Sequence, residues 1–244
     1  MKNIYLIVGK SGSGKDTIVN ALCEDYGYKR LVSYTTRPQR SDPNDAKSHI
    51  FVDIEDYRRD KDNGRIVAET FYNGHFYWAT KKQVDESDLY IIDVPGVKSI
   101  KERYFGKPAV VIAVEADDSV RTRRMVLRGD NSVNVAKRMA LDEEEFRELP
   151  SLTDYVVLSE DSGIDIPVGM LARSIHRTIQ NHEEHKTSSD TTAIKLWLQA
   201  RKAPDKMTVL SDVMKAVDGY KDTDMVPVSG RLLRDIATAL GNEI

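Results

Sequence analysis

Cysteine is nearly absent from this chain, because Cys23 is the only one among 244 residues. A single cysteine excludes an intrachain disulfide and is typical of a protein from a reducing compartment. The chain also lacks an apolar run long enough to cross a bilayer. Its first predicted strand starts at Asn3 or Ile4, which leaves no room for a signal peptide. We therefore expect a cytoplasmic protein without a membrane partner.

An excess of charge of one sign is missing as well. Lysine and arginine number 36, aspartate and glutamate 39, and the formal net charge is -3. Without a basic field, binding to nucleic acid is not expected. Hydrophobic residues make up 40% and charged residues 31%, which is the balance of a globular chain with a buried core. The length suits one large domain, or a domain of about 180 residues with a small appendage.

Short, continuous, β-branched runs recur in the first two thirds of the chain, and such runs are typical of strands buried in a parallel sheet. They lie at residues 4–8, 89–93, 109–114 and 155–158. Helical patterns alternate with them at residues 16–24, 119–127, 133–149 and 168–180. This alternation predicts a three-layer α/β fold that binds ligands at the carboxyl ends of its strands. Residues 32–82 break the rhythm and are interpreted as an insertion beside that site.

The most specific motif follows the first predicted strand and opens the first predicted helix. It consists of Gly9, Lys10, Ser11, Gly12, Ser13, Gly14 and Lys15. Glycines allow the backbone to point successive N–H groups into one concavity, and the N-terminus of the following helix adds its positive field. Lys15 brings a mobile positive charge to the β- and γ-phosphates. The order of strand, loop, lysine and helix therefore predicts a P-loop that binds ATP.

One position departs from the P-loop pattern. A serine or threonine usually follows the lysine, and its hydroxyl binds magnesium. Here Asp16 stands at that position and Thr17 comes next. Either residue could reach the metal, directly or through water. The alternative is that Asp16 only stabilises the first turn of the helix.

Two groups of arginines indicate a second anionic ligand. Arg37 and Arg40 can converge on one phosphate, since a guanidinium pairs bidentately with phosphate oxygens. The second group lies on a helix and a flexible loop and consists of Arg121, Arg123, Arg124, Arg128 and Arg138. Arginines on a mobile flap can neutralise a phosphoryl group in transfer, although a solvated basic surface is the alternative for both groups. Together with the P-loop they predict phosphoryl transfer between two phosphate-bearing ligands.

These motifs in combination resemble the guanylate kinases over roughly residues 1–180. The segments that carry the resemblance are GKSGSGKDT, SYTTRPQR, Glu69 with YNGHFYWAT, DVPGVKSI, RRMVLRGDNS with Arg138, and TDYVVLSED. The resemblance implies transfer of the ATP γ-phosphate to GMP with Mg²⁺. It also implies a kinase domain over residues 1–183, with a nucleoside-monophosphate-binding insertion at about 32–82 and an arginine-bearing lid at about 121–148.

The resemblance further implies roles for single residues. The catalytic set would be Lys15, Arg37, Arg124, Arg128 and Arg138, and ATP would bind the P-loop from Gly9 through Asp16 and Thr17. The acceptor nucleotide would contact Ser33, Arg37, Arg40, His49, Glu69, Tyr77 or Trp78, Thr80 and Asp93. Arg37 and Arg40 would hold its phosphate. The Glu69 carboxylate would accept hydrogen bonds from the guanine edge, where N1–H and the amine are both donors.

Most departures from the family lie on the acceptor side. His49 and the Trp78–Ala79 pair replace the usual tyrosine and tyrosine–glycine, and the register of Glu69 against Gly74 differs. We therefore expect a nucleoside monophosphate kinase that acts on GMP or dGMP, with a different base preference as one alternative. A non-catalytic interaction module of the same fold is another alternative. Lys15 and the arginines favour the enzyme.

The resemblance ends before the last quarter of the chain. Residues 184–193 are polar and predict a linker, and residues 194–244 predict a small helical module that loosely resembles a winged-helix unit. Basic and acidic residues roughly balance in this module, so a nucleic-acid footprint is not evident. We expect it to pack on the kinase core or to mediate self-association.

Overall fold

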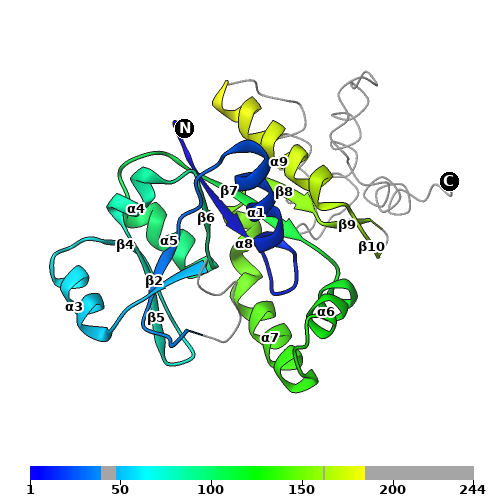
Figure 1. Cartoon of the computed structure of the whole chain (residues 1–244), viewed down its shortest axis with the longest axis horizontal. Coiled ribbons are helices and arrows are strands. Elements are labelled where there is room, and N and C mark those ends of the chain that lie inside the picture. The colour runs from blue at the N-terminus through cyan, green and yellow to red at the C-terminus, as the bar shows by residue number, and fades with distance from the viewer. Residues whose placement is uncertain (40–47, 162, 185–244) are drawn as a thin grey trace.

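The computed structural model describes residues 1–39, 48–161 and 163–184 of the chain (Figure 1). The expected linker and C-terminal module lie outside the described residues, except for Glu184 at the linker's first position. Arg40 also lies outside them. Among the described residues, no helix combines the length and the apolar character that crossing a membrane requires.

A four-stranded parallel sheet forms the centre of the described structure, as the alternating pattern predicts. Its strand order is β6-β1-β7-β8, so the first strand lies between two that follow much later in the chain. The strands are β1 (Ile4–Val8), β6 (Leu89–Ile91), β7 (Ala109–Glu115) and β8 (Tyr155–Leu158). Every residue of β1 is buried, because helices cover both faces of the sheet.

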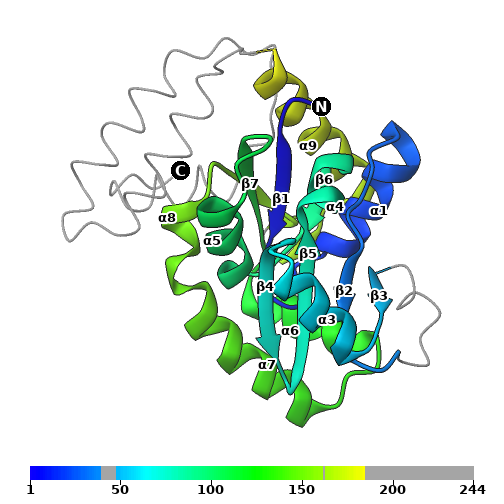
Figure 2. The same ribbon diagram turned by 90° about the vertical axis from the view of Figure 1, so that its left-hand side faces the viewer.

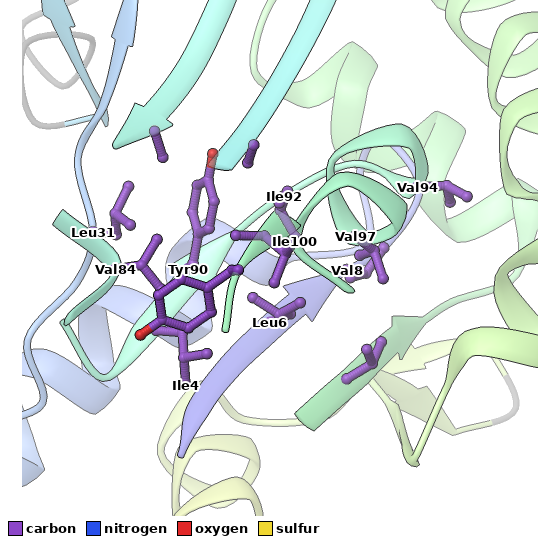
Figure 3. Close-up of a cluster of buried hydrophobic side chains, with 14 of the residues drawn as sticks. Ile4, Leu6, Val8, Leu31, Val84, Tyr90, Ile92, Val94, Val97 and Ile100 are labelled. Carbon is purple, nitrogen blue, oxygen red and sulfur yellow. The ribbon is translucent and has the colours of Figure 1, made fainter. Parts of the chain in front are cut away.

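The two layers of helices meet alternate side chains of β1. Tyr5 and Ile7 pack in one cluster with residues of α1 (Lys15–Tyr26) and α9 (Val168–Glu183). On the other face, Leu6 and its neighbours pack against residues of α5 (Val94–Arg103), as Figure 3 shows for Val97 and Ile100. The sheet thus has helices on both faces, which confirms the three-layer α/β prediction.

A second sheet, of order β3-β2-β5-β4, lies within the insertion. Its strands are β2 (Ser33–Thr35), β3 (His49–Phe51), β4 (Ile66–Tyr72) and β5 (His75–Thr80). Helix α3 (Ile54–Asp62) packs against it, and α4 (Lys81–Glu86) leads back to the main sheet (Figure 2). Strands β4 and β5 form a hairpin whose turn residues Asn73 and Gly74 both have positive φ, as a two-residue hairpin turn requires.

The lid predicted at about residues 121–148 falls mainly on α6 (Asp118–Leu127) and α7 (Ser132–Glu145). The long helix expected at residues 133–149 is in fact interrupted, because α7 gives way to a 3-10 turn (Phe146–Glu148) and then α8 (Leu149–Leu152). After β8, the short strands β9 (Glu160–Asp161) and β10 (Ile164–Asp165) form a small antiparallel ribbon. In both views the insertion and the lid helices extend from the same end of the main sheet (Figures 1 and 2).

Candidate functional site

The glycine-rich loop connects β1 to α1 and needs its glycines for two physical reasons. Gly12 and Gly14 have φ values of 78° and 90°, in the left-handed region that other residues rarely adopt. In addition, a Cβ atom on Gly12 would lie 2.7 Å from the carbonyl oxygen of Arg121, and one on Gly9 would collide with the carbonyl oxygen of Val114. The loop is therefore pressed between the end of β7 and helix α6.

Lys15 is the first residue of α1 and lines the cleft above the loop. Burial lowers the pKa of its ammonium below the ordinary value, while the carboxylates of Asp16 and Asp142 raise it in part. An ammonium in this position gains strongly from an incoming anion, because a phosphate replaces the lost hydration.

Arg124 is bonded to the glycine-rich loop and to residues that follow β8. Arg124 donates from Nη1 to the carbonyl oxygen of Gly12 at 3.1 Å and to Ser159 Oγ at 2.9 Å, and from Nη2 to Asp165 Oδ1 at 2.7 Å. Arg128 pairs with Asp130, and the Arg138 guanidinium lies 3.8 Å from the same carboxylate. All three arginines line the same cavity as Gly12, Gly14 and Lys15, so an anion bound there would meet several positive charges.

Arg121 differs from the other lid arginines because its side chain is only 1% exposed. Its guanidinium lies 3.5 Å from Asp142 of α7, and Asp142 in turn accepts a hydrogen bond of 2.8 Å from the backbone N–H of Ser11. Lys10 similarly reaches Glu143 of α7 at 3.0 Å. The lid is thus connected to the phosphate loop by two carboxylates that the sequence analysis did not single out.

Two cavities, of about 720 Å³ and about 370 Å³, open around this loop. Gly12, Gly14, Asp16, Thr17, Arg37, Arg124 and Arg128 line the larger one, and Ala68, Glu69, Thr70 and Asp93 line the smaller one. The side chains that line both are Ser11, Lys15, Ser33, His49, Tyr77, Ile91 and Arg138. These shared residues show that the two cavities meet. Both volumes are within the range of small-molecule sites.

Three predicted acceptor residues, one each from β2, β3 and β5, lie on one face of the insertion sheet. Ser33 Oγ and His49 Nδ1 are 2.9 Å apart, and the His49 and Tyr77 rings are 5.3 Å apart. Arg37 lies over the Phe51 ring, with its guanidinium carbon 5.2 Å from the centroid. The structure therefore brings Ser33, His49 and Tyr77 together at the junction of the cavities, with Arg37 in the larger one.

Glu69, Trp78 and Thr80 are differently placed. Trp78 is fully buried, with its indole N–H donating to Asp60 at 3.2 Å, so Tyr77 rather than Trp78 is the aromatic residue that lines the cavities. Thr80 caps α4 in a reciprocal pair with Gln83. Glu69 accepts hydrogen bonds from residues of α3 and α5. Burial raises the pKa of its carboxyl, but the bonds from these donors outweigh that and leave the pKa below its ordinary value.

Asp16 and Thr17 both line the larger cavity and are exposed. Asp16 Oδ1 accepts a hydrogen bond of 2.9 Å from Arg30 Nη2, which holds the carboxylate at the mouth of the loop. Oxygen donors of this kind are the ligands that Mg²⁺ prefers, usually with water and phosphate oxygens completing its shell. The residues present therefore fit a magnesium ion that arrives with a nucleotide.

Glu145, on the last turn of α7, lines the smaller cavity and was not predicted from the sequence. Burial, and then the carboxylates of Asp93 and Asp142, raise the pKa of Glu145 to about 7. Asp93 itself begins α5, where its Oδ1 accepts hydrogen bonds from Gly96 N at 2.8 Å and Thr70 Oγ1 at 2.9 Å. A carboxyl titrating near neutral pH in a cleft is a common feature of functional sites.

Known proteins of similar sequence belong to one family. The guanylate kinase family model matches residues 1–178. Guanylate kinase of Cupriavidus metallidurans is 25% identical over 183 residues, which cover 72% of this chain and 83% of that protein. Guanylate kinase of Legionella pneumophila strain Lens is 26% identical over 166 residues, covering 65% and 79%.

The solved structures agree on the fold. The crystal structure of guanylate kinase from Anaplasma phagocytophilum aligns with a TM-score of 0.50 at 24% identity and covers 74% of this chain and 86% of that one. The family match extends over well more than half of the chain and includes the P-loop, the insertion and the lid. The chain therefore belongs to the guanylate kinase family, which phosphorylates GMP with ATP.

Proposed function

We propose that this chain transfers the γ-phosphoryl group of ATP to the phosphate of GMP or dGMP, forming ADP and the nucleoside diphosphate. The observation that carries the proposal is the meeting of two cavities at one set of residues. Lys15 and Arg138 from the donor side, and Ser33, His49 and Tyr77 from the insertion, line both cavities. Two nucleotides bound there would face each other across this junction.

On the donor side, the P-loop N–H groups and Lys15 would hold the β- and γ-phosphates. Arg124, Arg128 and Arg138 would neutralise the charge that spreads over the transferring group. An acceptor phosphate oxygen attacks the γ-phosphorus as the bond to the β-phosphate oxygen breaks, so the protein contributes mainly positioning and charge stabilisation. The lowered pKa of Lys15 supports this role, since an ammonium deprived of water favours an anionic ligand.

On the acceptor side, Arg37 would hold the phosphate of the nucleoside monophosphate together with Arg40, with Ser33, His49 and Tyr77 beside it. Asp93 would lie near the rest of the acceptor nucleotide, because it lines the smaller cavity. His49, where the resemblance predicts a tyrosine, would donate a hydrogen bond to this phosphate more weakly as a neutral imidazole than as an imidazolium.

Magnesium would accompany ATP and would neutralise part of the negative charge of its phosphates. Asp16 or Thr17 would hold it at the start of α1. Asp16 offers a carboxylate that Arg30 keeps in place, and Thr17 offers a hydroxyl. We further propose a cytoplasmic location, which the single cysteine supports. Self-association through residues 194–244 belongs to the same proposal.

A coupled assay for ADP with a panel of nucleoside monophosphates tests the proposal. We expect turnover with GMP or dGMP. Lys15→Ala and Arg37→Ala should each lower kcat/KM at least about a hundredfold, because charge-stabilising contacts contribute several kcal/mol to such reactions. Lys82→Ala, which removes an exposed lysine outside the cleft, is the matched control. Folded protein without turnover on any nucleotide would instead favour a non-catalytic interaction module.

A further inference from the structure

The hairpin of β4 and β5 presents different side chains on its two faces. Residues paired across an antiparallel ladder share a face, and the next pair lies on the opposite face. Glu69 is paired with Trp78, and Thr70 with Tyr77. Trp78 contacts Tyr57 of α3, with ring centroids 5.2 Å apart. The Glu69 pair therefore faces α3, and the Thr70 pair faces the cleft.

Glu69 is occupied by structural partners on the α3 side. Its Oε2 accepts from the Tyr57 hydroxyl at 2.9 Å and from Lys61 at 3.3 Å, and its Oε1 accepts from Arg103 at 2.8 Å. The carboxylate borders the smaller cavity, but two cations already neutralise its charge. Its contacts tie α3 and α5 to the hairpin.

Thr70, in contrast to Glu69, lies on the cleft side of the strand. Its Oγ1 lies 2.9 Å from Asp93 Oδ1, and the same oxygen of Asp93 accepts from Gly96 N at 2.8 Å. A hydroxyl has one hydrogen and two lone pairs. Because its hydrogen is donated to Asp93, Thr70 offers only acceptor lone pairs to another partner. Asp93, fixed at the start of α5, thus orients the hydroxyl as an acceptor.

The smaller cavity suits a nucleobase. Apolar side chains such as Ala68, Ile92, Leu141 and Phe146 contribute to its walls, and Thr70 lines it. It joins the proposed acceptor-phosphate site at Ser33, His49 and Tyr77. A nucleotide whose phosphate lies at that junction would extend its base into this cavity.

We propose that Thr70, oriented by Asp93, accepts a hydrogen bond from the acceptor base and that Glu69 is a structural residue. This inference rests on the proposed function. The guanine edge carries two neighbouring donors, N1–H and the 2-amine, so it satisfies an acceptor-only hydroxyl. The corresponding edge of adenine places its N1 lone pair toward the same hydroxyl and is disfavoured. Thr70 is thus the specificity-determining residue, and Asp93 is a positioning residue.

Steady-state kinetics with GMP and AMP on four proteins tests this assignment: the wild type, Thr70→Val, Thr70→Ser and Glu69→Gln. Thr70→Val keeps the β-branched shape but removes the hydroxyl. It should lower kcat/KM for GMP at least about fivefold, mainly through KM, and leave the value for AMP nearly unchanged. Thr70→Ser should restore most of the loss. Glu69→Gln should lower the melting temperature. The ratio of its kcat/KM for GMP to its kcat/KM for AMP should stay within about twofold of the wild-type ratio.

The opposite pattern, in which Glu69→Gln abolishes the preference for GMP and Thr70→Val preserves it, would overturn the inference. Calorimetric titration with GMP makes the same comparison without turnover, and Thr70→Ala replaces Thr70→Val if the latter does not fold. A wild-type protein that binds GMP but does not phosphorylate it would refute the proposed function alone. Equal GMP affinities of the wild type and the Thr70 variants would refute the base assignment alone.

Discussion

Replacement of Glu145 by glutamine should stabilise the protein above neutral pH and have little effect in acid. The carboxyl lies among the carboxylates of Asp93 and Asp142, and burial together with these charges raises its pKa to about 7 from an ordinary 4.5. The backbone of Val94 and the ammonium of Lys15 oppose the change but do not cancel it. The folded protein therefore holds a proton that the unfolded chain releases.

The sign of the effect follows from proton linkage. Between about pH 4.5 and pH 7 the folded state binds more protons than the unfolded state at this site, so the free energy of unfolding falls as pH rises. The full pKa difference would correspond to about 3 kcal/mol. Because Glu145 is only partly buried, solvent screens much of this energy, and we expect about 1 kcal/mol. Glutamine does not ionise and avoids this penalty.

Thermal melting of the wild type, Glu145→Gln and Glu144→Gln at about pH 5 and about pH 8 measures the difference. Glu144 is an exposed neighbour on the same helix and serves as the matched control. At the higher pH, Glu145→Gln should melt about 2–4 °C above the wild type, and most of this gain should disappear at the lower pH. A gain that is equal at both values, or larger in acid, would refute the reasoning.

Two further predictions concern the loop and the end of α9. Gly12→Ala should lower the melting temperature and the ATP affinity more than Gly64→Ala does. Both glycines have positive φ, but of the two only Gly12 lies against another backbone segment. Equal losses for the two variants in melting and ATP-binding assays would show that this close approach is unimportant. Deletion of residues 185–244 should leave GMP turnover largely intact. A longer deletion, of residues 181–244, also removes Glu183. The Glu183 carboxylate accepts hydrogen bonds from Lys2 N, Asn3 N and the Tyr5 hydroxyl. Loss of those hydrogen bonds should lower the free energy of unfolding by about 1–3 kcal/mol. Equal melting temperatures of the two truncated proteins would contradict this prediction.

Local patterns in the sequence were sufficient to predict the first strand and the glycine-rich loop that follows it. The glycines at 9, 12 and 14 and the buried run at residues 4–8 are contiguous signals. The structure forms β1 from the buried run and places the glycines in the loop before α1, where Gly9 and Gly12 lie close to other backbone atoms. The acidic run of α7 was less informative, because carboxylates on a helix usually form a solvated face. Only the packing of α7 against the loop shows that Asp142 and Glu145 face inward.

Predicting the acceptor half of the site required the register of β4 against β5, and hydrophobic periodicity alone does not determine that register. Between Ile66 and Ala68, β4 advances two residues while β5 advances one, so the ladder contains a bulge. A shift of one residue moves every later side chain of the strand to the opposite face. This is why the structure turns Glu69 toward α3 and Thr70 toward the cleft.

The burial of Trp78 and the orientation of Glu69 are linked, because the two residues are paired across the strands. Trp78 is fully buried against Tyr34 and Tyr57 and donates its N–H to Asp60. On the cleft side, the indole would lose the hydrogen bond to Asp60 and the contact with Tyr57. Burying the indole on the α3 side therefore favours the register in which its cross-strand neighbour, Glu69, also faces α3. The next pair along the ladder, Thr70 with Tyr77, then lies on the opposite face, which leaves a threonine on the cleft side of the strand.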